Sequence, residues 1–186
     1  MRVIAGTSKG RKLGPVPPGV RPVADRAREG VFSSLAAAVP EALVLDLYAG
    51  TGALGIEALS RGAGSAVFVD RSHQATAAIH GNLSHLGLEA RGTVVTADAR
   101  TFLTGPGGAG PFDLVFLDPP YDLAAADVEA VLEVLAAGPR LREGWTVALT
   151  RGTKSSMPVI PLDWVVARRL RYGDSLVIVY REVRWA

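Results

Sequence analysis

The sequence predicts an α/β protein whose sheet is mostly parallel, with an antiparallel strand near its edge. Short apolar runs rich in β-formers alternate along the chain with segments of helical periodicity, as in sheets built from β/α units. A glycine-rich turn, residues 49–55, connects one of these runs to a helix. The last two β-rich runs, 164–171 and 175–181, flank Tyr-Gly-Asp, which is typical of a hairpin. Seven strands are expected in total.

Composition limits the classes of protein to consider. A chain of 186 residues, 48% of them apolar, is long enough for one domain with a sizeable core. It has no cysteine, which excludes disulfides, a thiol nucleophile and a cysteine-based zinc site. Because it has neither a signal peptide nor an apolar run long enough to span a bilayer, we expect a soluble, cytoplasmic protein. We expect it to be a monomer.

Positive charge is concentrated at the N-terminus. Residues 1–28 contain seven basic residues and one acid, a net charge of +6, whereas the remainder has 13 basic and 17 acidic residues. A turn at residues 6–10 between short β-rich segments predicts a basic hairpin suited to following a phosphate backbone; the alternative is a solvated tail. The candidate nucleic-acid-binding residues are Arg2, Lys9, Arg11, Lys12, Arg21, Arg26 and Arg28.

A linker is predicted to follow this hairpin. Residues 14–22 are rich in proline and glycine, so they cannot form a helix and should let the hairpin sit apart from the core. The predicted division is therefore an N-terminal arm with its linker, residues 1–22, and a main domain, residues 23–186. Asp25 has the character of an N-cap for a helix that extends to about Ala38.

The first strand of the main domain, residues 43–48, leads into the glycine-rich turn and then a helix. Glycines permit a tight turn and close backbone approach, and the helix N-terminus offers free N–H groups. A second strand, 66–69, ends at Asp70, which lies where a carboxylate can accept hydrogen bonds from a ribose. An adenosine-containing cofactor is therefore predicted, either a nicotinamide dinucleotide or S-adenosylmethionine. The alternative is that the glycine-rich turn serves only the packing of the fold. The candidate residues are Asp46, Ala49, Gly50, Thr51, Gly52, Gly55 and Asp70.

Two of the acidic residues at strand ends have two interpretations each. Asp46 either lies near the amino group of the cofactor or is a buried acid bonded to the glycine turn. A helix at 72–86 and a strand at 92–96 precede Asp98 and Ala99. Asp98 either accepts the amino group of an adenine or caps the next helix, and the two roles are compatible.

The three histidines of the chain do not predict a metal site. His73, His80 and His85 all fall in the helix at 72–86, and only the first two share a face. These two are two helical turns apart, too far for a common metal ion. We interpret all three as surface or packing residues.

The predicted strand 112–117 gives the clearest indication of chemical function, because the sequence Asp-Pro-Pro-Tyr follows it directly. Two adjacent prolines lack N–H groups and have fixed φ, so strand pairing must stop there. Ligands of open α/β sheets bind beyond the carboxyl ends of the strands. The motif therefore holds an acceptor and an aromatic face toward a flat, hydrogen-bonding substrate. The candidate catalytic residues are Asp118, Pro119, Pro120 and Tyr121. A helix at 124–137 and a strand at 145–150 follow.

Together these motifs resemble the class I S-adenosylmethionine-dependent methyltransferases, with their Rossmann-like fold, and more narrowly the RsmD family. The resemblance covers nearly the whole chain. It implies methylation of the exocyclic amino group of one guanine in 16S ribosomal RNA, within an assembled or partly assembled small subunit. It rests on residues 2–6, 10–13, 21–32, 45–63, 118–121 and 172–174. The chain departs from the family at Asp70, more often Glu, at Thr150, where an acid is common, and at Val23-Ala24, more often two threonines.

The chemistry of amino-group methylation, independently of the resemblance, predicts roles for the residues of the Asp-Pro-Pro-Tyr motif. The Asp118 carboxylate and the Pro119 carbonyl are expected to accept the two N–H bonds of the guanine amino group, and Tyr121 to stack on the flipped base. The released proton goes either to Asp118 or to water. Two other functions remain open, a DNA amino-methyltransferase and a non-catalytic nucleotide-binding module for ribosome assembly. The N-terminal arm argues against the first, and the intact motif argues against the second.

Overall fold

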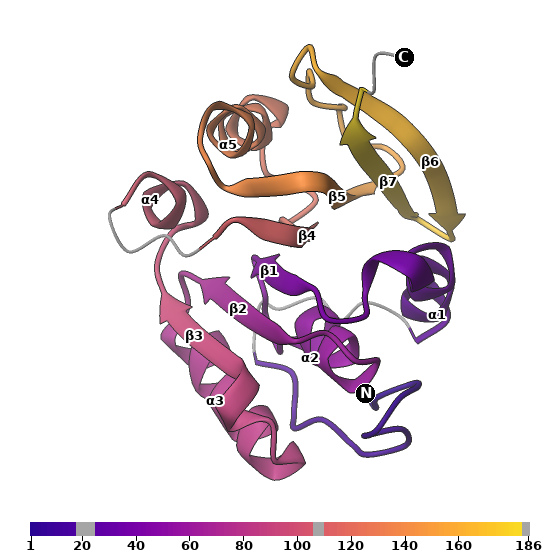
Figure 1. The fold of residues 1–186 in the computed structure, drawn as a ribbon, viewed down its shortest axis with the longest axis vertical. Helices are drawn as coiled ribbons and strands as arrows, with labels where there is room; N and C mark the ends of the chain where they lie inside the picture. Colours follow the sequence, from indigo (N-terminus) through magenta and orange to yellow (C-terminus); the bar gives the residue numbers. More distant parts are fainter. Residues whose placement is uncertain (18–24, 106–109, 184–186) are drawn as a thin grey trace.

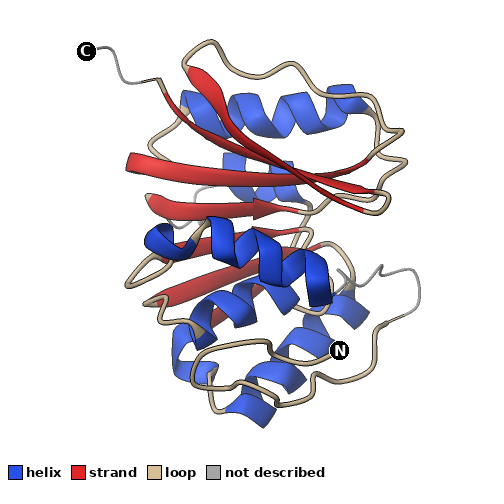
Figure 2. Cartoon of the chain, turned by 90° about the vertical axis from the view of Figure 1, so that its right-hand side faces the viewer, coloured by secondary structure: helices blue, strands red, loops and turns tan. Residues whose placement is uncertain are grey.

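The computed structural model describes residues 1–17, 25–105 and 110–183, which form one seven-stranded sheet with helices on both faces (Figures 1 and 2). The strand order is β3-β2-β1-β4-β5-β7-β6. Strands β1 to β5 are parallel, β7 is antiparallel to β5, and β6 pairs antiparallel with β7 at the edge. The predicted fold class is confirmed. The strands are β1 (Leu43–Leu47), β2 (Ser65–Asp70), β3 (Gly92–Thr96), β4 (Phe112–Leu117), β5 (Leu141–Gly152), β6 (Trp164–Tyr172) and β7 (Ser175–Glu182).

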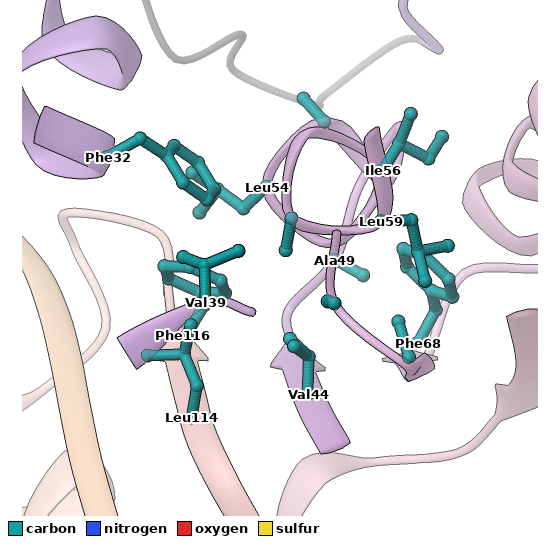
Figure 3. Close-up of a cluster of buried hydrophobic side chains, with 14 of the residues drawn as sticks. Phe32, Val39, Val44, Ala49, Leu54, Ile56, Leu59, Phe68, Leu114 and Phe116 are labelled. Atoms are coloured by element: carbon teal, nitrogen blue, oxygen red, sulfur yellow. The ribbon is translucent and has the colours of Figure 1, made fainter. Parts of the chain in front are cut away.

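The helices divide between the two faces of the sheet (Figure 1). Apolar side chains of α1, α2 and α3 pack on one face, and those of α4 and α5 pack on the other, so the core has two clusters. Figure 3 shows the first cluster, where the rings of Phe32 and Phe116 lie 5.5 Å apart between centroids. The helices are α1 (Asp25–Ser34), α2 (Ala53–Ser60), α3 (His73–Leu86), α4 (Ala99–Thr104) and α5 (Ala125–Ala137), with short 3₁₀ helices at Ala36–Ala38 and Glu89–Arg91. No helix of the described residues is long and apolar enough to cross a membrane.

Several element boundaries differ by one or more residues from the sequence prediction, including those of the first helix, β1 and β5. The first helix ends at Ser34 and continues only as a 3₁₀ turn. Strand β1 ends at Leu47, because Tyr48 has a φ of 59° and turns the chain away from the sheet. Strand β5 begins at Leu141 rather than 145, because Leu141 pairs with Phe112 before a register shift in the ladder. Only the partner strand reveals this extension.

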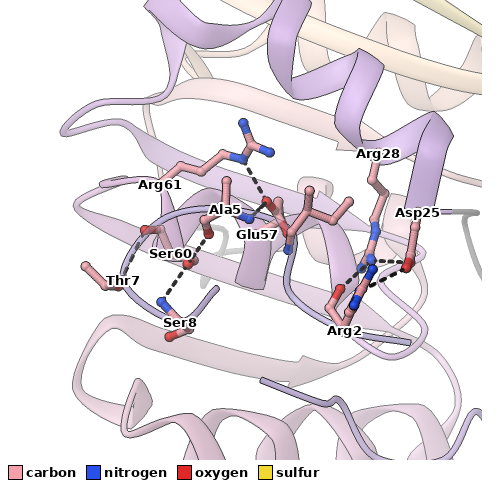
Figure 4. A network of polar contacts seen from close by, with 10 residues as sticks. Arg2, Ala5, Thr7, Ser8, Asp25, Arg28, Glu57, Ser60 and Arg61 are labelled. Carbon is pink, nitrogen blue, oxygen red and sulfur yellow. Dashed lines mark hydrogen bonds and ion pairs between the residues drawn. The ribbon is translucent and has the colours of Figure 1, made fainter. Parts of the chain in front are cut away.

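The N-terminal arm does not sit apart from the core, so that expectation is wrong. It packs over α2, where the buried Glu57 carboxylate accepts the backbone N–H groups of Ile4 at 2.8 Å and Ala5 at 3.0 Å (Figure 4). Within the arm, one isolated antiparallel bridge joins Arg2 to Lys12. A hairpin of two regular strands therefore remains a prediction.

The end of α2 completes the docking of the arm. Ser60 donates its hydroxyl to the Ala5 carbonyl at 2.6 Å and accepts the Ser8 N–H at 3.0 Å, while its carbonyl accepts the Thr7 N–H at 2.8 Å. Arg61 binds the same Glu57 carboxylate at 2.7 Å. The arm has little regular secondary structure, so its buried backbone N–H and C=O groups need hydrogen-bond partners from elsewhere. Glu57 and Ser60 of α2 supply them.

A pair of glycine substitutions tests this docking. Gly6 and Gly10 both have a φ of 82°, but a Cβ at Gly6 would lie 1.8 Å from the Ser60 carbonyl oxygen, whereas a Cβ at Gly10 meets nothing within 4 Å. Gly10→Ala should cost about 1–2 kcal/mol from backbone strain alone. Gly6→Ala should cost roughly 1–3 kcal/mol more, because the arm must move away from α2. Urea unfolding of both variants measures the difference, and equal losses would show that the arm is not docked as described.

Some sequence predictions fall outside the described residues. These are Arg21, the Val23-Ala24 pair that departs from the family, the linker from residue 18 onward, and residues 106–109 of the glycine-rich surface loop.

Candidate active site

The carboxyl ends of the central strands lie side by side. The Asp118 N–H, directly after β4, donates to the Leu47 carbonyl at the end of β1 at 3.3 Å. The Ala49 N–H, directly after β1, donates to the Val69 carbonyl of β2 at 3.1 Å. From β1 the chain proceeds outward through β2 and β3, and from β4 it proceeds outward in the other direction through β5. The strand order therefore reverses between β1 and β4, and ligands of open α/β sheets bind at such a switch point. The fold therefore brings the glycine turn and the Asp-Pro-Pro-Tyr motif together.

The glycine turn, residues 49–55, combines left-handed backbone with close helix packing. Gly50 and Gly52 have φ angles of 56° and 76°, and α2 begins directly after Gly52 without a side-chain cap. A Cβ at Gly55 would lie 2.3 Å from the Phe68 ring of β2, so this third glycine lets α2 pack closely on the sheet. The sequence prediction of a tight turn into a helix N-terminus is thus confirmed, and part of its glycine content serves packing.

Asp46 is a buried carboxylate with one engaged oxygen. Its Oδ2 accepts the Gly55 N–H at 2.8 Å, which confirms the predicted bond to the glycine turn. Its Oδ1 is buried and has no hydrogen-bond partner. Burial raises the pKa of Asp46 well above its usual range, and the nearby charges of Asp118 and Asp70 raise this pKa further. A cationic group placed against Oδ1 would satisfy this acceptor and favour its ionised form.

Asp70 and Asp98 lie at the ends of the next two strands. Asp70 accepts the N–H groups of Gly50 and Ser72, both at 2.9 Å, so it ties the glycine turn to the start of α3. Asp98 uses its Oδ1 to accept the N–H groups of Arg100 and Thr101. The N-cap interpretation of Asp98 is therefore confirmed, and its second oxygen takes no part in the cap.

Tyr48 is a site residue that sequence reasoning missed. Its left-handed backbone is uncommon for a bulky residue and starts the turn between β1 and the glycines. Burial raises the pKa of Tyr48 to about 12, and the charges of Asp98 and Asp127 add to the effect. Tyr48 directly precedes the glycine turn, so it adjoins the predicted cofactor site. Nothing in a run of strand-forming residues signals this turn, because its backbone conformation depends on the neighbouring strands.

The Asp-Pro-Pro-Tyr motif, residues 118–121, is held on several sides. The Pro120 carbonyl accepts the Leu123 N–H at 3.0 Å, closing a turn. The Tyr121 hydroxyl lies 2.5 Å from the Ser175 hydroxyl at the start of β7, and Ser155 donates its hydroxyl to the Tyr121 carbonyl at 2.8 Å. Asp118 is partly exposed, whereas Pro119 is buried. The motif thus presents a carboxylate on a fixed backbone.

Most of the predicted nucleic-acid-binding residues in the described chain are exposed. The guanidinium of Arg11 is partly committed, because it donates to the carbonyls of His85 and Leu86 at the end of α3. The others lie on the arm and at the start of α1 with accessible side chains; they are Arg2, Lys9, Lys12 and Arg26.

Arg28 requires a correction. Its side chain is fully buried and donates to the Arg2 carbonyl at 2.5 Å and to the Asp25 carboxylate at 2.7 Å (Figure 4). Burial lowers the pKa of Arg28, against the opposing effect of Asp25. A guanidinium in this position cannot contact RNA, so Arg28 joins α1 to the arm instead. Its spacing three residues after Asp25 could have indicated such a pair.

Histidines and acids do not gather into a metal site in the described ranges. No group of three or more His, Cys, Asp or Glu side chains there is arranged to hold a metal ion. All three histidines are exposed, His73 at the start of α3 and His80 and His85 further along it.

The strand order, the antiparallel β7 and the glycine turn beside an acidic strand end define the Rossmann-like fold of class I methyltransferases. A magnesium protoporphyrin IX methyltransferase from Synechocystis shares this fold at 18% identity, with a TM-score of 0.66 over 85% of this chain and 79% of that one.

The chain belongs to the family described as conserved hypothetical protein 95, whose model matches residues 1–181. It is 33% identical to the ribosomal RNA small subunit methyltransferase D of Escherichia coli K12, over 97% of this chain and 89% of that protein. A solved Escherichia coli structure, yhhF, described as a candidate methyltransferase, has 30% identity and a TM-score of 0.87 over 100% of this chain and 99% of that one. The resemblance to the RsmD family is thereby confirmed.

Proposed function

We propose that this protein transfers a methyl group from S-adenosylmethionine to the exocyclic amino group of a guanine in small-subunit ribosomal RNA. The observation that carries this proposal is the position of the Asp-Pro-Pro-Tyr motif. The Asp118 N–H is bonded to the end of β1, so the motif adjoins the glycine turn and its acidic neighbours. The relatives named ribosomal RNA small subunit methyltransferase D support methylation of small-subunit ribosomal RNA.

The residues at the strand ends fit the proposed cofactor. The buried Oδ1 of Asp46 lacks a partner and is suited to the methionine ammonium group. Asp70 is suited to accept hydrogen bonds from the ribose hydroxyls. The Asp98 oxygen that takes no part in the helix cap is suited to accept one from the adenine amino group. The turn formed by Ala49, Gly50, Thr51 and Gly52, with Ala99 after Asp98, would surround the rest. When bound, S-adenosylmethionine supplies an electrophilic methyl group on its sulfonium.

The chain's own residues prepare the nucleophile. A guanine amino group is a weak nucleophile because its lone pair is delocalised into the ring. The Asp118 carboxylate and the Pro119 carbonyl accept its two N–H bonds, which aims the nitrogen and favours a more tetrahedral geometry. As the new N–C bond forms and the S–C bond breaks, one amino proton leaves to Asp118 or to water. Fixed alignment of this kind lowers a barrier by several kcal/mol.

RNA recognition is assigned to the exposed basic residues of the arm. Lys9 lies in the turn of the arm, and Lys12 is bridged to Arg2. Arg2 and Arg26 lie near the start of α1. Because the arm is already docked on α2, its cations can bind phosphates without the entropy cost of ordering a flexible segment. Tyr121 then stacks on a base taken out of its helix. The specific guanine and the requirement for an assembled or partly assembled small subunit follow from the family resemblance.

Methyl-labelled S-adenosylmethionine tests the proposal. The protein is incubated with small ribosomal subunits, with free 16S RNA and with DNA, and each product is digested to nucleosides. We expect label in N²-methylguanosine from RNA, with faster incorporation into subunits than into free RNA. Label in adenine of DNA would identify a DNA amino-methyltransferase, and label in none of the substrates would favour a binding module.

A further inference from the structure

Arg151 is a buried cation that the proposed mechanism does not use. It lies near the end of β5 and is 1% exposed. Its guanidinium donates to three backbone carbonyls, those of Leu123 at 2.8 Å, Pro120 at 3.4 Å and Ser156 at 3.4 Å. It therefore joins the end of β5 to both sides of Tyr121.

Within the described residues, no acid forms an ion pair with the Arg151 guanidinium. Its Nε has no hydrogen-bond partner. Burial lowers the pKa of Arg151. Burying an unpaired cation is costly, and apolar replacements of buried charged groups are often neutral or stabilising. Stability of the fold is thus a poor explanation for an arginine here.

The backbone of the segment that Arg151 contacts offers few groups for hydrogen bonding. Pro119 and Pro120 have no N–H groups, so only their carbonyls can be bound. A guanidinium presents several donors in a rigid plane, and it can therefore bind two carbonyls of one turn together. Neighbouring residues hold Tyr121 itself, since a Cβ at Gly152 would lie 2.7 Å from its ring and Ser155 binds its carbonyl.

We propose that Arg151 is a positioning residue that fixes the Asp-Pro-Pro-Tyr motif by holding the Pro120 and Leu123 carbonyls. This proposal rests on the assigned role of the motif in orienting the target amino group. Loss of the guanidinium should loosen the turn that carries Tyr121 and misalign Asp118 and Pro119. The chemical step then slows, while the cofactor site on β1 and β2 stays intact.

Three variants test the proposal. Arg151→Met keeps the volume and removes every donor, whereas Arg151→Lys keeps the charge but cannot hold two carbonyls in a fork. Arg91→Met is the matched control, because Arg91 donates to one carbonyl, that of Ala63, away from the strand ends that carry the motif. The readouts are kcat and KM with small subunits, the melting temperature, and hydrogen exchange of residues 118–125.

The expected pattern separates positioning from support of the fold. Arg151→Met should lower kcat about 10- to 100-fold, with KM for the cofactor nearly unchanged, no fall in melting temperature and faster exchange at 118–125. Arg151→Lys should lie between Arg151→Met and the wild type, and Arg91→Met should match the wild type. If Arg151→Met does not fold, the lysine variant is judged by the same criteria.

Two results would overturn the proposal. One is a wild-type kcat in a folded Arg151 variant, and the other is unchanged exchange at 118–125. Should the wild-type protein methylate no RNA at all, the proposed function fails. The exchange comparison still decides whether Arg151 holds the motif in that case.

Discussion

Replacing Asp118 by alanine is expected to lower the rate of methyl transfer by about 10²–10³-fold, which is typical for loss of one preorganised group at a reacting centre. The variant loses the carboxylate that aims the amino group, while the backbone bond from its N–H to Leu47 remains. Single-turnover kinetics with small subunits measure the chemical step. Calorimetric titration with S-adenosylmethionine should show an affinity within a fewfold of wild type.

Asp118→Asn separates the two possible roles of this carboxylate. The amide oxygen can still accept an N–H bond, but it cannot take up the proton. If Asp118 only positions the nitrogen, the asparagine variant should retain most of the activity; if Asp118 is the proton acceptor, it should be as slow as Asp118→Ala. Asp122→Ala, an exposed acid in the same loop, is the control and should have wild-type kinetics. Near-normal turnover in Asp118→Ala would contradict the assignment.

Asp46→Asn is expected to weaken cofactor binding about 10- to 100-fold, because a hydrogen bond to a charged group is worth roughly 1.5–3 kcal/mol. The asparagine oxygen can still accept the Gly55 N–H. Its second position then carries an amide NH₂, which cannot accept the ammonium group. Asp113→Asn is the control, because Asp113 binds the Leu43 N–H at the amino end of β1. An unchanged affinity in Asp46→Asn would remove Asp46 from the cofactor site.

Without cofactor, Asp46→Asn should gain folding stability relative to the wild type as pH rises. The folded state raises the pKa of Asp46, so this group favours folding below its unfolded pKa of about 3.9, and that contribution is lost as pH rises toward the folded pKa. Asparagine does not titrate. The stability of Asp46→Asn relative to wild type should therefore increase between pH 4 and the folded pKa. Urea unfolding from pH 5 to 8 without cofactor measures this, and a constant difference would contradict the raised pKa.

Local patterns predicted much of the fold correctly. Strands β3 and β4 have the predicted bounds, and α3 ends at the predicted Leu86, with Ser72 as its N-cap and Gly87 as its C-cap. These features depend on residues that are neighbours in sequence, namely apolar runs, a side-chain cap and a glycine in left-handed conformation. The Asp-Pro-Pro-Tyr motif follows from local sequence in the same way, because two adjacent prolines without N–H groups end the pairing of a central strand.

Predictions that depended on distant partners were less successful. The arm was expected to stand apart, yet Glu57 accepts its N–H groups from more than 50 positions away in the chain. Arg28 was expected to bind RNA because charge alone does not reveal burial. Arg151 and Tyr48 were not recognised as site residues, because their roles depend on packing between distant segments.

The sequence by itself determined the α/β class, the glycine turn, the acids at the strand ends and the motif at residues 118–121. Each is encoded by residue types at short spacing, where backbone sterics and hydrogen bonding act locally. Only the tertiary structure decided that Asp46 keeps one buried oxygen without a partner, and that the buried Arg151 guanidinium donates to the Pro120 and Leu123 carbonyls. Burial and hydrogen-bond partners arise when distant segments pack together, so no local pattern can specify them.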